Sequence, residues 1–538
     1  MRSSFPHFAA CTLIAASMAT FTASSAAEEA PRIVQNNGRY ALLVDGKPFL
    51  MMGGQIHNSS AWPSELPQVF ESMQALHANT LEAPVYWEQM EPKESTFDFA
   101  NVDALVQGAR EHKLRLILLW FGTWKNGQMH YAPDWVKTDT KRFPRVIRED
   151  GAPIDVLSAN SRSNLEADKT AFVALMHHLK QLDADAHTVI AVQVENESGN
   201  VGAVRDNSPQ SNTEFARPVP ADLLAIVHKQ PGTWSQAFAA EAGETFQAYY
   251  QAKYINEIAA AGKAEFNVPM YINVWLSYPP AELPERAMRL AGIQYPSGGA
   301  VQKFIGMWRA LAPSLDLIGP DIYSDDSGFY ADILHTYARK DNPLLIPETG
   351  RTDSYAKFLF SALGDGAIGF SPFGVDGKGW NILGEGGASA HAYNYALLGP
   401  IQGQLAQWNF DGHLKTSVEE PGQAQQEIDF GKWQATVSYG FPQHDGRRPP
   451  GTKDAHGTAL VALLGPDEFL VTGIDASISF HLPGKPTGQR MQILSAQEGT
   501  YDNGTWKRVR IWNGDETDRG LSFPKGQPAL VRVRLGEF

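Results

Sequence analysis

Short apolar runs recur along the first three quarters of the chain, each preceded by a stretch whose apolar residues are spaced three or four apart. That spacing predicts helices, and the uninterrupted runs rich in Val, Ile and Leu predict strands buried on both faces. Alternating strands and helices give a parallel sheet, and eight repeats favour a closed (β/α)8 barrel. The eight predicted strands are the run from Met51, then 80–85, 114–120, 188–197, 268–275, 315–323, 344–348 and 366–373.

The pattern changes after Ser417 into strand-like runs broken by Gly, Pro, Asp and Asn, with almost no helical spacing. This pattern is typical of an antiparallel β-sandwich. Just upstream of the barrel, 40–52 predicts a hairpin, because Asp45-Gly46 separates two apolar runs. Extra length beyond a minimal barrel is expected in long loops at 122–167 and 200–243. We therefore predict a barrel domain over 28–412 and a β-sandwich domain over 413–538.

The first residues have the features of an export signal. Arg2 precedes an apolar stretch, 9–21, and small residues lead to Ala27, after which we expect cleavage. The only cysteine, Cys11, lies within this segment, so the mature chain would lack a thiol for a disulfide or a metal. Lipid attachment at Cys11 is the less favoured alternative, because it precedes most of the apolar stretch. We expect the product, without 1–27, to be periplasmic or secreted.

Charge and hydropathy narrow the class of partner. The formal net charge is −14, and no long cluster of Lys and Arg occurs. Nucleic acid and anionic membrane surfaces are therefore disfavoured as partners. Beyond the export signal no stretch has the ~18 uninterrupted apolar residues of a membrane span. A neutral substrate is the expectation.

Carboxylates stand at the ends of two predicted buried strands. The strand at 188–197 runs into Gln193, Glu195, Asn196 and Glu197, and the strand at 344–348 ends at Glu348. Active sites of (β/α)8 barrels are built at the carboxyl ends of the strands, and a carboxylate pair is what hydrolysis of a glycosidic bond requires. In an extended strand Glu195 and Glu197 share one face, so alternation alone leaves both as candidates.

Motifs of other reaction classes are missing from the sequence. It has no His-Glu-x-x-His, no Gly-x-Ser-x-Gly, no Gly-Lys-Ser/Thr phosphate loop and no Gly-x-Gly-x-x-Gly directly after a strand. His177 and His178 are adjacent on a predicted helix and so project in different directions. We therefore expect neither a metal nor another cofactor.

The chain resembles the β-galactosidases of glycoside hydrolase family 35 over roughly residues 40 to 400. The matching segments are Asp45–Phe49, Gly54–His57, Asn79–Trp87 with Glu91-Pro92, Tyr131–Trp135 and Val192–Glu197. The resemblance implies a retaining (β/α)8 enzyme in which the Glu directly after Asn, here Glu197, is the acid/base and Glu348 is the nucleophile. One departure is Pro84, which stands where the family has a sugar-contacting Tyr.

Other residues follow from the same expectation. Asn196 would hydrogen-bond the sugar 2-hydroxyl, and Tyr323 would donate to Glu348; a core position is the alternative for Tyr323. Candidates for binding sugar hydroxyls are Gln55 and His57, although His57 could equally be a buried structural residue. Candidates for stacking on the sugar face are Trp120 and Trp275.

These observations predict a retaining, exo-acting β-galactosidase that removes terminal β-galactosides from oligo- or polysaccharides. Pro347–Arg351 and the single small β domain resemble the compact bacterial branch of the family, some of whose members remove galactose from xyloglucan. Alternatives are a related β-mannosidase, β-glucosidase or arabinosidase, and a carbohydrate-binding protein without turnover. A third alternative makes the C-terminal domain a carbohydrate-binding module, with Trp506 and Trp512 as its aromatic candidates.

Overall fold

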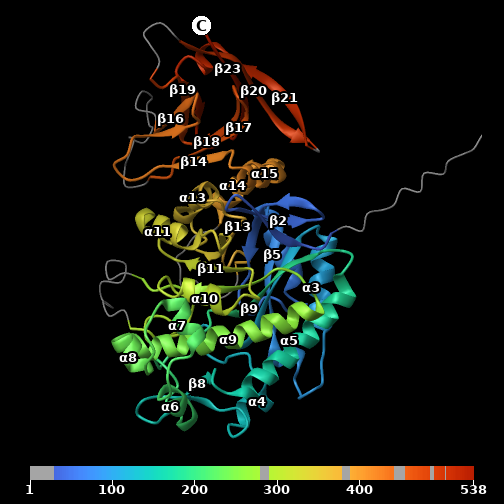
Figure 1. Cartoon of the computed structure of the whole chain (residues 1–538). Helices are drawn as coiled ribbons and strands as arrows, with labels where there is room; N and C mark the ends of the chain where they lie inside the picture. Colours follow the sequence, from blue (N-terminus) through green and yellow to red (C-terminus); the bar gives the residue numbers. More distant parts are fainter. Residues whose placement is uncertain (1–28, 279–289, 378–387, 441–454, 485–489, 503) are drawn as a thin grey trace, which may run out of the picture.

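The computed structural model describes residues 29–278, 290–377, 388–440, 455–484, 490–502 and 504–538 (Figure 1). The expected export signal, with Cys11, lies outside these residues. The lower part of the view in Figure 1 is built from alternating helices and strands, and the upper part mainly from strands.

The eight strands predicted from the sequence form one closed parallel barrel, so the predicted fold is confirmed. Their order around the barrel is β4-β5-β6-β9-β10-β11-β12-β13, which follows the chain. Nearly all their residues are buried, which explains why they appear in the sequence as continuous apolar runs. The strands are β4 (Met51–Gln55), β5 (Thr80–Tyr86), β6 (Arg115–Lys125), β9 (Val189–Asn196), β10 (Met270–Trp275), β11 (Leu317–Ile322), β12 (Leu345–Thr349) and β13 (Gly369–Pro372).

Helices surround the barrel, and their buried faces are those that the sequence spacing indicates. The helix α1 (Leu66–Leu76) buries Val69, Met73 and Leu76. The helix α3 (Ala100–Glu111) likewise buries its predicted apolar stripe. The other helices of the outer layer are α5 (Arg162–Asp183), α9 (Ala242–Glu265), α10 (Ile305–Leu311), α11 (Ser327–Tyr337), α13 (Phe358–Gly364), α14 (Ser389–Leu398) and α15 (Gln402–Asp411).

The two long connections are more ordered than the sequence suggests. The strand β6 continues to Lys125, so the first connection begins later than expected. It contains the helix α4 (Asp134–Thr138) and the hairpin of β7 (Arg145–Ile147) and β8 (Pro153–Leu157). The second connection contains the short helices α6 (Pro209–Phe215), α7 (Ala221–Val227) and α8 (Trp234–Phe238). Other short helices are α2 (Trp87–Met90) and α12 (Asp353–Ala356).

The predicted hairpin precedes the barrel. The strands β2 (Arg39–Val44) and β3 (Lys47–Phe49) pair antiparallel, and β1 (Arg32–Asn36) pairs with β2. Asp45 and Gly46 have φ angles of 52° and 73°. Two successive positive φ angles are those of the type I′ turn, which Asp-Gly favours. The hairpin ends at Phe49, and Met51 opens the first barrel strand.

The C-terminal segment forms two antiparallel sheets, as predicted. The six-stranded sheet has the order β14-β17-β18-β23-β20-β21, and the four-stranded sheet β15-β16-β19-β22. An apolar cluster that includes Trp433, Phe469 and Phe523 draws on both sheets. The strands are β14 (Leu414–Val418), β15 (Gln425–Asp429), β16 (Gln434–Tyr439), β17 (Thr458–Gly465), β18 (Glu468–Ile474), β19 (Ala476–His481), β20 (Met491–Asp502), β21 (Thr505–Trp512), β22 (Leu521–Phe523) and β23 (Leu530–Glu537).

The barrel and the C-terminal sheets pack on a common apolar core. The largest buried cluster contains barrel residues together with Leu414, Leu460, Leu470 and Leu530 of the six-stranded sheet. Thr416 of β14 also donates through Oγ1 to the carbonyl of Phe360 in α13, at 2.7 Å. The connection between the two parts is short, because α15 ends at Asp411 and β14 begins at Leu414.

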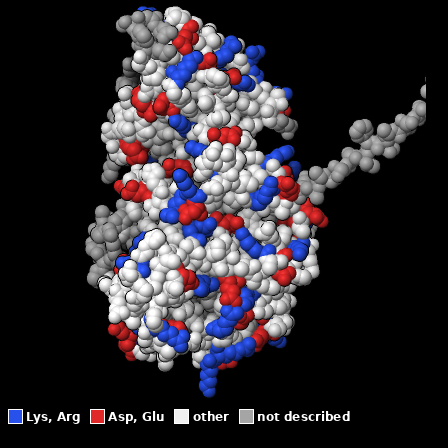
Figure 2. Space-filling view, viewed as in Figure 1, with Lys and Arg blue, Asp and Glu red and all other residues white. Residues whose placement is uncertain are grey.

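Acidic and basic side chains alternate over the face seen in Figure 2, so this face has no broad patch of one charge. None of the helices in the described ranges is both long and apolar enough to span a bilayer.

Candidate active site

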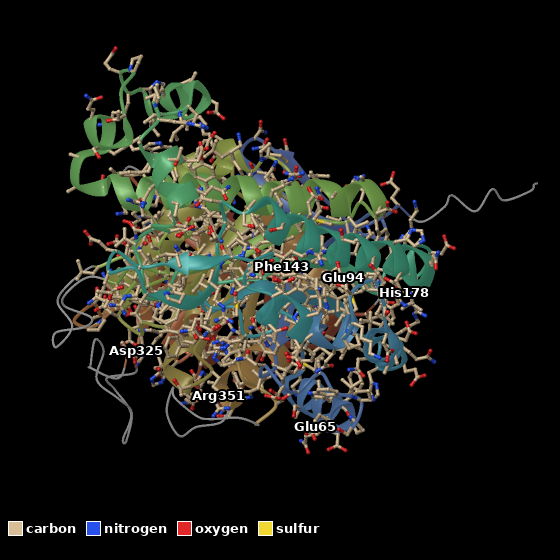
Figure 3. The ribbon with its side chains drawn as sticks, turned by 90° about the horizontal axis from the view of Figure 1, so that it is seen from below. Glu65, Glu94, Phe143, His178, Asp325 and Arg351 are labelled. Carbon is tan, nitrogen blue, oxygen red and sulfur yellow. The ribbon has the colours of Figure 1, made fainter. Side chains whose placement is uncertain are left out.

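The carboxyl ends of β9, β11 and β12 bring three acidic side chains together. One carboxyl oxygen each of Glu197, Asp321 and Glu348 lies within 4.8 Å of the other two, and all three residues are buried. In Figure 3, Asp325 and Arg351, from the segments after β11 and β12, both lie in the lower left part of the view. Two acids from the sequence analysis, Glu197 and Glu348, are thus neighbours.

Glu195 and Glu197 do not share one face of a regular strand, so that expectation is wrong. Both residues have left-handed backbone angles, with φ of 66° and 45°. Such angles interrupt the alternation of an extended strand. The carboxylate of Glu195 turns to β6, where it accepts hydrogen bonds from the backbone N–H groups of Thr123 (3.2 Å) and Trp124 (2.7 Å). The carboxyl of Glu197 faces the acidic cluster.

Glu348 is held by two donors. Gln55 Nε2, at the end of β4, donates to Glu348 Oε2 at 2.8 Å. The hydroxyl of Tyr323, just after β11, donates to Glu348 Oε1. Both oxygens therefore accept hydrogen bonds, which is the arrangement that suits a carboxylate anion. Gln55 and Tyr323 thus contact Glu348, as expected for Tyr323, whereas the sequence assigned Gln55 to the sugar.

Asp321 is a member of the cluster that the sequence analysis missed. Its Oδ2 accepts a hydrogen bond from Asn273 Nδ2 at 2.7 Å, and Asn273 Oδ1 accepts from the backbone N–H of Glu197 at 2.8 Å. Asn273 thereby connects Asp321 to the backbone of Glu197. The signal in the sequence is slight: a polar residue interrupts the apolar run at 270–275, and Asp321 lies two residues before Tyr323.

Burial sets the protonation of this cluster. Burial and, next, the negative charge of Glu348 together raise the pKa of Glu197 to about 8, against the opposing effect of the Lys125 cation. Burial also raises the pKa of Asp321 well above its usual value, again with Glu348 as the next cause. Like charges so close together cannot all be ionised in a site shielded from water. At neutral pH Glu197 therefore carries a proton.

Three carboxylates could also coordinate a divalent cation, a possibility that the sequence did not reveal. The hydrogen bonds favour protons over a cation here. Both oxygens of Glu348 and one of Asp321 already accept donors from Gln55, Tyr323 and Asn273. A cation would also have to displace the protons that burial places on Glu197 and Asp321.

His57 lies at the rim and is fixed by an acid. Its Nδ1 is 2.5 Å from Asp376 Oδ1, and its ring packs edge-on against Phe373, with the centroids 5.1 Å apart. The ring keeps 12% of its side-chain surface exposed. His57 is thus neither a core residue nor in contact with the acidic cluster through any hydrogen bond described for it.

The two tryptophan candidates differ. Trp120 is fully buried, and its Nε1 donates to Asp168 Oδ1 at 2.9 Å. Because β6 continues five residues beyond it, from Phe121 to Lys125, Trp120 lies inside the wall and cannot stack on a sugar. That candidate is wrong. Trp275 is the last residue of β10 and is partly exposed, so it remains a candidate.

Comparison with known proteins shows which families parts of the chain resemble. Residues 41–269 match the family model described as glycosyl hydrolases family 35. This match covers less than half of the chain. This matched segment includes β4 to β9, with Asn196 and Glu197, and ends before β10. Residues 391–524 match a domain of unknown function, DUF5597, which begins within α14 and extends through β22. Residues 41–269 are thus similar to glycosyl hydrolases.

Curated proteins named beta-galactosidase are similar to part of the chain. The chain is 29% identical over 168 residues to a beta-galactosidase of Xanthomonas manihotis, covering 29% of this chain and 25% of the relative. It is 25% identical over 193 residues to beta-galactosidase 8 of Oryza sativa subsp. japonica, covering 35% of this chain and 27% of the relative. The chain thus matches about a quarter of the length of these relatives.

Among solved structures, similarity extends over more of the chain at lower identity. A cold-adapted beta-galactosidase from Rahnella sp. R3 has a TM-score of 0.46 and 18% identity, covering 70% of this chain and 59% of that one. A beta-galactosidase from Marinomonas ef1 has a TM-score of 0.46 and 11% identity, covering 69% and 62%.

Proposed function

We propose that this protein is a retaining, exo-acting β-galactosidase in which Glu197 is the acid/base and Glu348 the nucleophile. The observation that carries the proposal is the pairing of a protonated, buried Glu197 with a Glu348 held by two donors, with oxygens of the two carboxyls within 4.8 Å. Retaining glycosidases keep their carboxyl groups about 5–5.5 Å apart, whereas inverting enzymes leave about 6.5–9.5 Å for a water.

The mechanism assigns each residue a chemical step. Glu348 attacks the anomeric carbon while Glu197 protonates the departing oxygen, which leaves a covalent glycosyl-enzyme. Glu197, now a carboxylate, then removes a proton from the water that hydrolyses the intermediate. Gln55 and Tyr323 hold Glu348 in the orientation for attack, and Asn273 holds the backbone of Glu197.

The sugar and its context are further parts of the proposal. The names of the partial relatives and the sequence resemblance support galactose, and the resemblance of Pro347–Arg351 to the compact bacterial branch of the family supports xyloglucan side chains as the natural source. A panel of nitrophenyl glycosides tests the sugar: the β-galactoside should be cleaved fastest, and a faster β-mannoside, β-glucoside or arabinoside would reassign it. Binding without turnover of any glycoside would indicate a carbohydrate-binding protein.

Variants of the two acids test the mechanism. Glu348→Gln should keep the fold but lose roughly three or more orders of magnitude in turnover, because no covalent intermediate forms. A variant that keeps a tenth of the wild-type rate would refute the assignment.

Glu197→Ala should nearly abolish cleavage of a natural disaccharide yet retain the first step on a dinitrophenyl galactoside, which needs no acid. Azide should then restore turnover and give the β-galactosyl azide. An α-azide would instead show that the enzyme inverts, and rescue in Glu195→Ala alone would reverse the assignment of the acid.

We also propose that the protein is exported, a proposal that rests on residues 1–27 alone. The N-terminal sequence of the mature protein should begin at Glu28.

A further inference from the structure

The extension of β6 reaches the proposed active site. Lys125, its last residue, pairs with Asn196 of β9. The turn that follows hydrogen-bonds the same segment, because the N–H of Asn126 donates to the carbonyl of Asn196 (3.2 Å) and that of Gly127 to the carbonyl of Glu197 (3.0 Å). Lys125 and the turn that follows it thus support the backbone of Asn196 and Glu197.

The side chain of Lys125 is buried against Asn196. It is 4% exposed, and its Nζ donates to Asn196 Oδ1 at 2.8 Å. An ammonium group can only donate, so its neighbour must be the amide oxygen. This contact fixes which way the Asn196 amide faces and turns Nδ2 away from Lys125.

Asn196 Nδ2 is left without a partner. The residue is fully buried, and Nδ2 has no hydrogen-bond acceptor among the residues that the structure describes. A buried amide donor is normally satisfied, and an unsatisfied one needs an explanation. Because Asn196 directly precedes Glu197, an acceptor on a bound sugar is the natural partner.

We propose that Lys125 is a positioning residue for sugar recognition, which holds Asn196 Oδ1 so that Asn196 Nδ2 donates to the 2-hydroxyl oxygen of the sugar. This inference rests on the proposed function. Lys125 also acts on the acid electrostatically, since its positive charge opposes the increase in the pKa of Glu197. One side chain thereby serves both the sugar contact and the acid.

A comparison of substrates with and without the 2-hydroxyl tests the proposal. We would measure kcat/KM of the wild type, Lys125→Met, Asn196→Ala and the double variant on an aryl β-galactoside and its 2-deoxy analogue, each at its pH optimum. Met keeps the length of the Lys stem but cannot donate. Lys125→Met should lose at least tenfold on the galactoside and less than threefold on the 2-deoxy analogue. The double variant should be no worse than Asn196→Ala, since both changes remove one contact.

Two further variants separate this role from a structural one. Lys125→Gln can still donate to Asn196, so it should recover part of the preference for the 2-hydroxyl that Met loses, and it also serves if Lys125→Met does not fold. Lys253→Met, at an exposed ion pair on α9, is the matched control and should change kcat/KM for neither substrate. Equal losses on both substrates, or additive losses in the double variant, would overturn the proposal.

Failure of the inference is distinguishable from failure of the proposed function. If the wild type cleaves a different glycoside, the proposed galactose specificity fails, and the same cycle is run on that sugar and its 2-deoxy form. If the wild type cleaves galactosides but Lys125→Met treats both substrates alike, only the role of Lys125 fails.

Discussion

Replacing the acid by its amide should make the protein more stable, by an amount that grows with pH. In the unfolded chain Glu197 would titrate near 4.5, whereas in the folded protein its pKa is about 8. Since the folded value is the higher one, folding requires proton uptake at any pH between the two, and stability falls as pH rises through this window. At 1.36 kcal/mol per unit the cost is about 3 kcal/mol at pH 7 and about 5 kcal/mol above pH 8. Glu197→Gln removes a titrating group and with it this cost.

The assay is urea unfolding followed by tryptophan fluorescence at pH 5, 6, 7 and 8. The stability difference between Glu197→Gln and the wild type should be small at pH 5 and increase by about 1.4 kcal/mol per unit up to pH 7. The matched control is Glu71→Gln, an exposed glutamate of α1, which should follow the wild type at every pH. A difference that stays constant from pH 5 to pH 8 would refute the protonated, buried state of Glu197.

Four further outcomes follow from the same geometry. The pH profile of kcat/KM should fall above about pH 8, as the proton of Glu197 is lost, and a profile flat to pH 10 would contradict the assignment of the acid. Glu195→Ala should lower the free energy of unfolding by about 2–4 kcal/mol, because the N–H of Trp124 loses its acceptor, that of Thr123 keeps only Asp168 Oδ2, and a cavity remains; yet it should show no dependence on the leaving group. Gly122→Ala should destabilise by about 1–3 kcal/mol, since its Cβ would lie 2.3 Å from Trp120 Nε1 and 2.8 Å from Glu195 Oε1; an unchanged melting temperature would show that the wall behind the site can relax. Exhaustive chelation should leave activity and melting temperature unchanged, and a loss that added divalent cation reverses would identify the acidic cluster as a metal site.

The barrel could be predicted because its strands bury both faces. A parallel strand covered by helices must be apolar along its whole length, so β9 and β12 stand out as runs that end abruptly at charge. The helices could be predicted equally well, because only one face of α1 or α3 is buried and the apolar residues are spaced accordingly. The ends of the strands were harder to predict. Nothing in the apolar run at 114–120 indicates that β6 continues to Lys125, because the neighbouring strands determine where a barrel strand ends.

Within the site, only those residues could be predicted that the local sequence identifies by itself. Glu197 and Glu348 each end a strand, which local sequence reveals. Asp321 and Lys125 belong to the site because the fold brings their segments close to Glu197. No residue spacing in the sequence indicates these tertiary contacts. The wrong placement of Trp120 has the same cause, because a tryptophan in a strand looks identical whether it faces a sugar or a buried aspartate.

Because the barrel and the C-terminal sheets share one apolar core, the two parts of the chain cannot be separated or exchanged independently. Leu414, Leu460, Leu470 and Leu530 belong to the same buried cluster as the barrel, and the DUF5597 match starts in a barrel helix. A truncation at residue 412 would therefore leave leucine-lined surface in water, a liability for aggregation. To graft this C-terminal segment onto another barrel, the recipient's surface at the positions of α13 to α15 would have to be redesigned. The C-terminal segment should therefore be transferred together with the helices that it packs against.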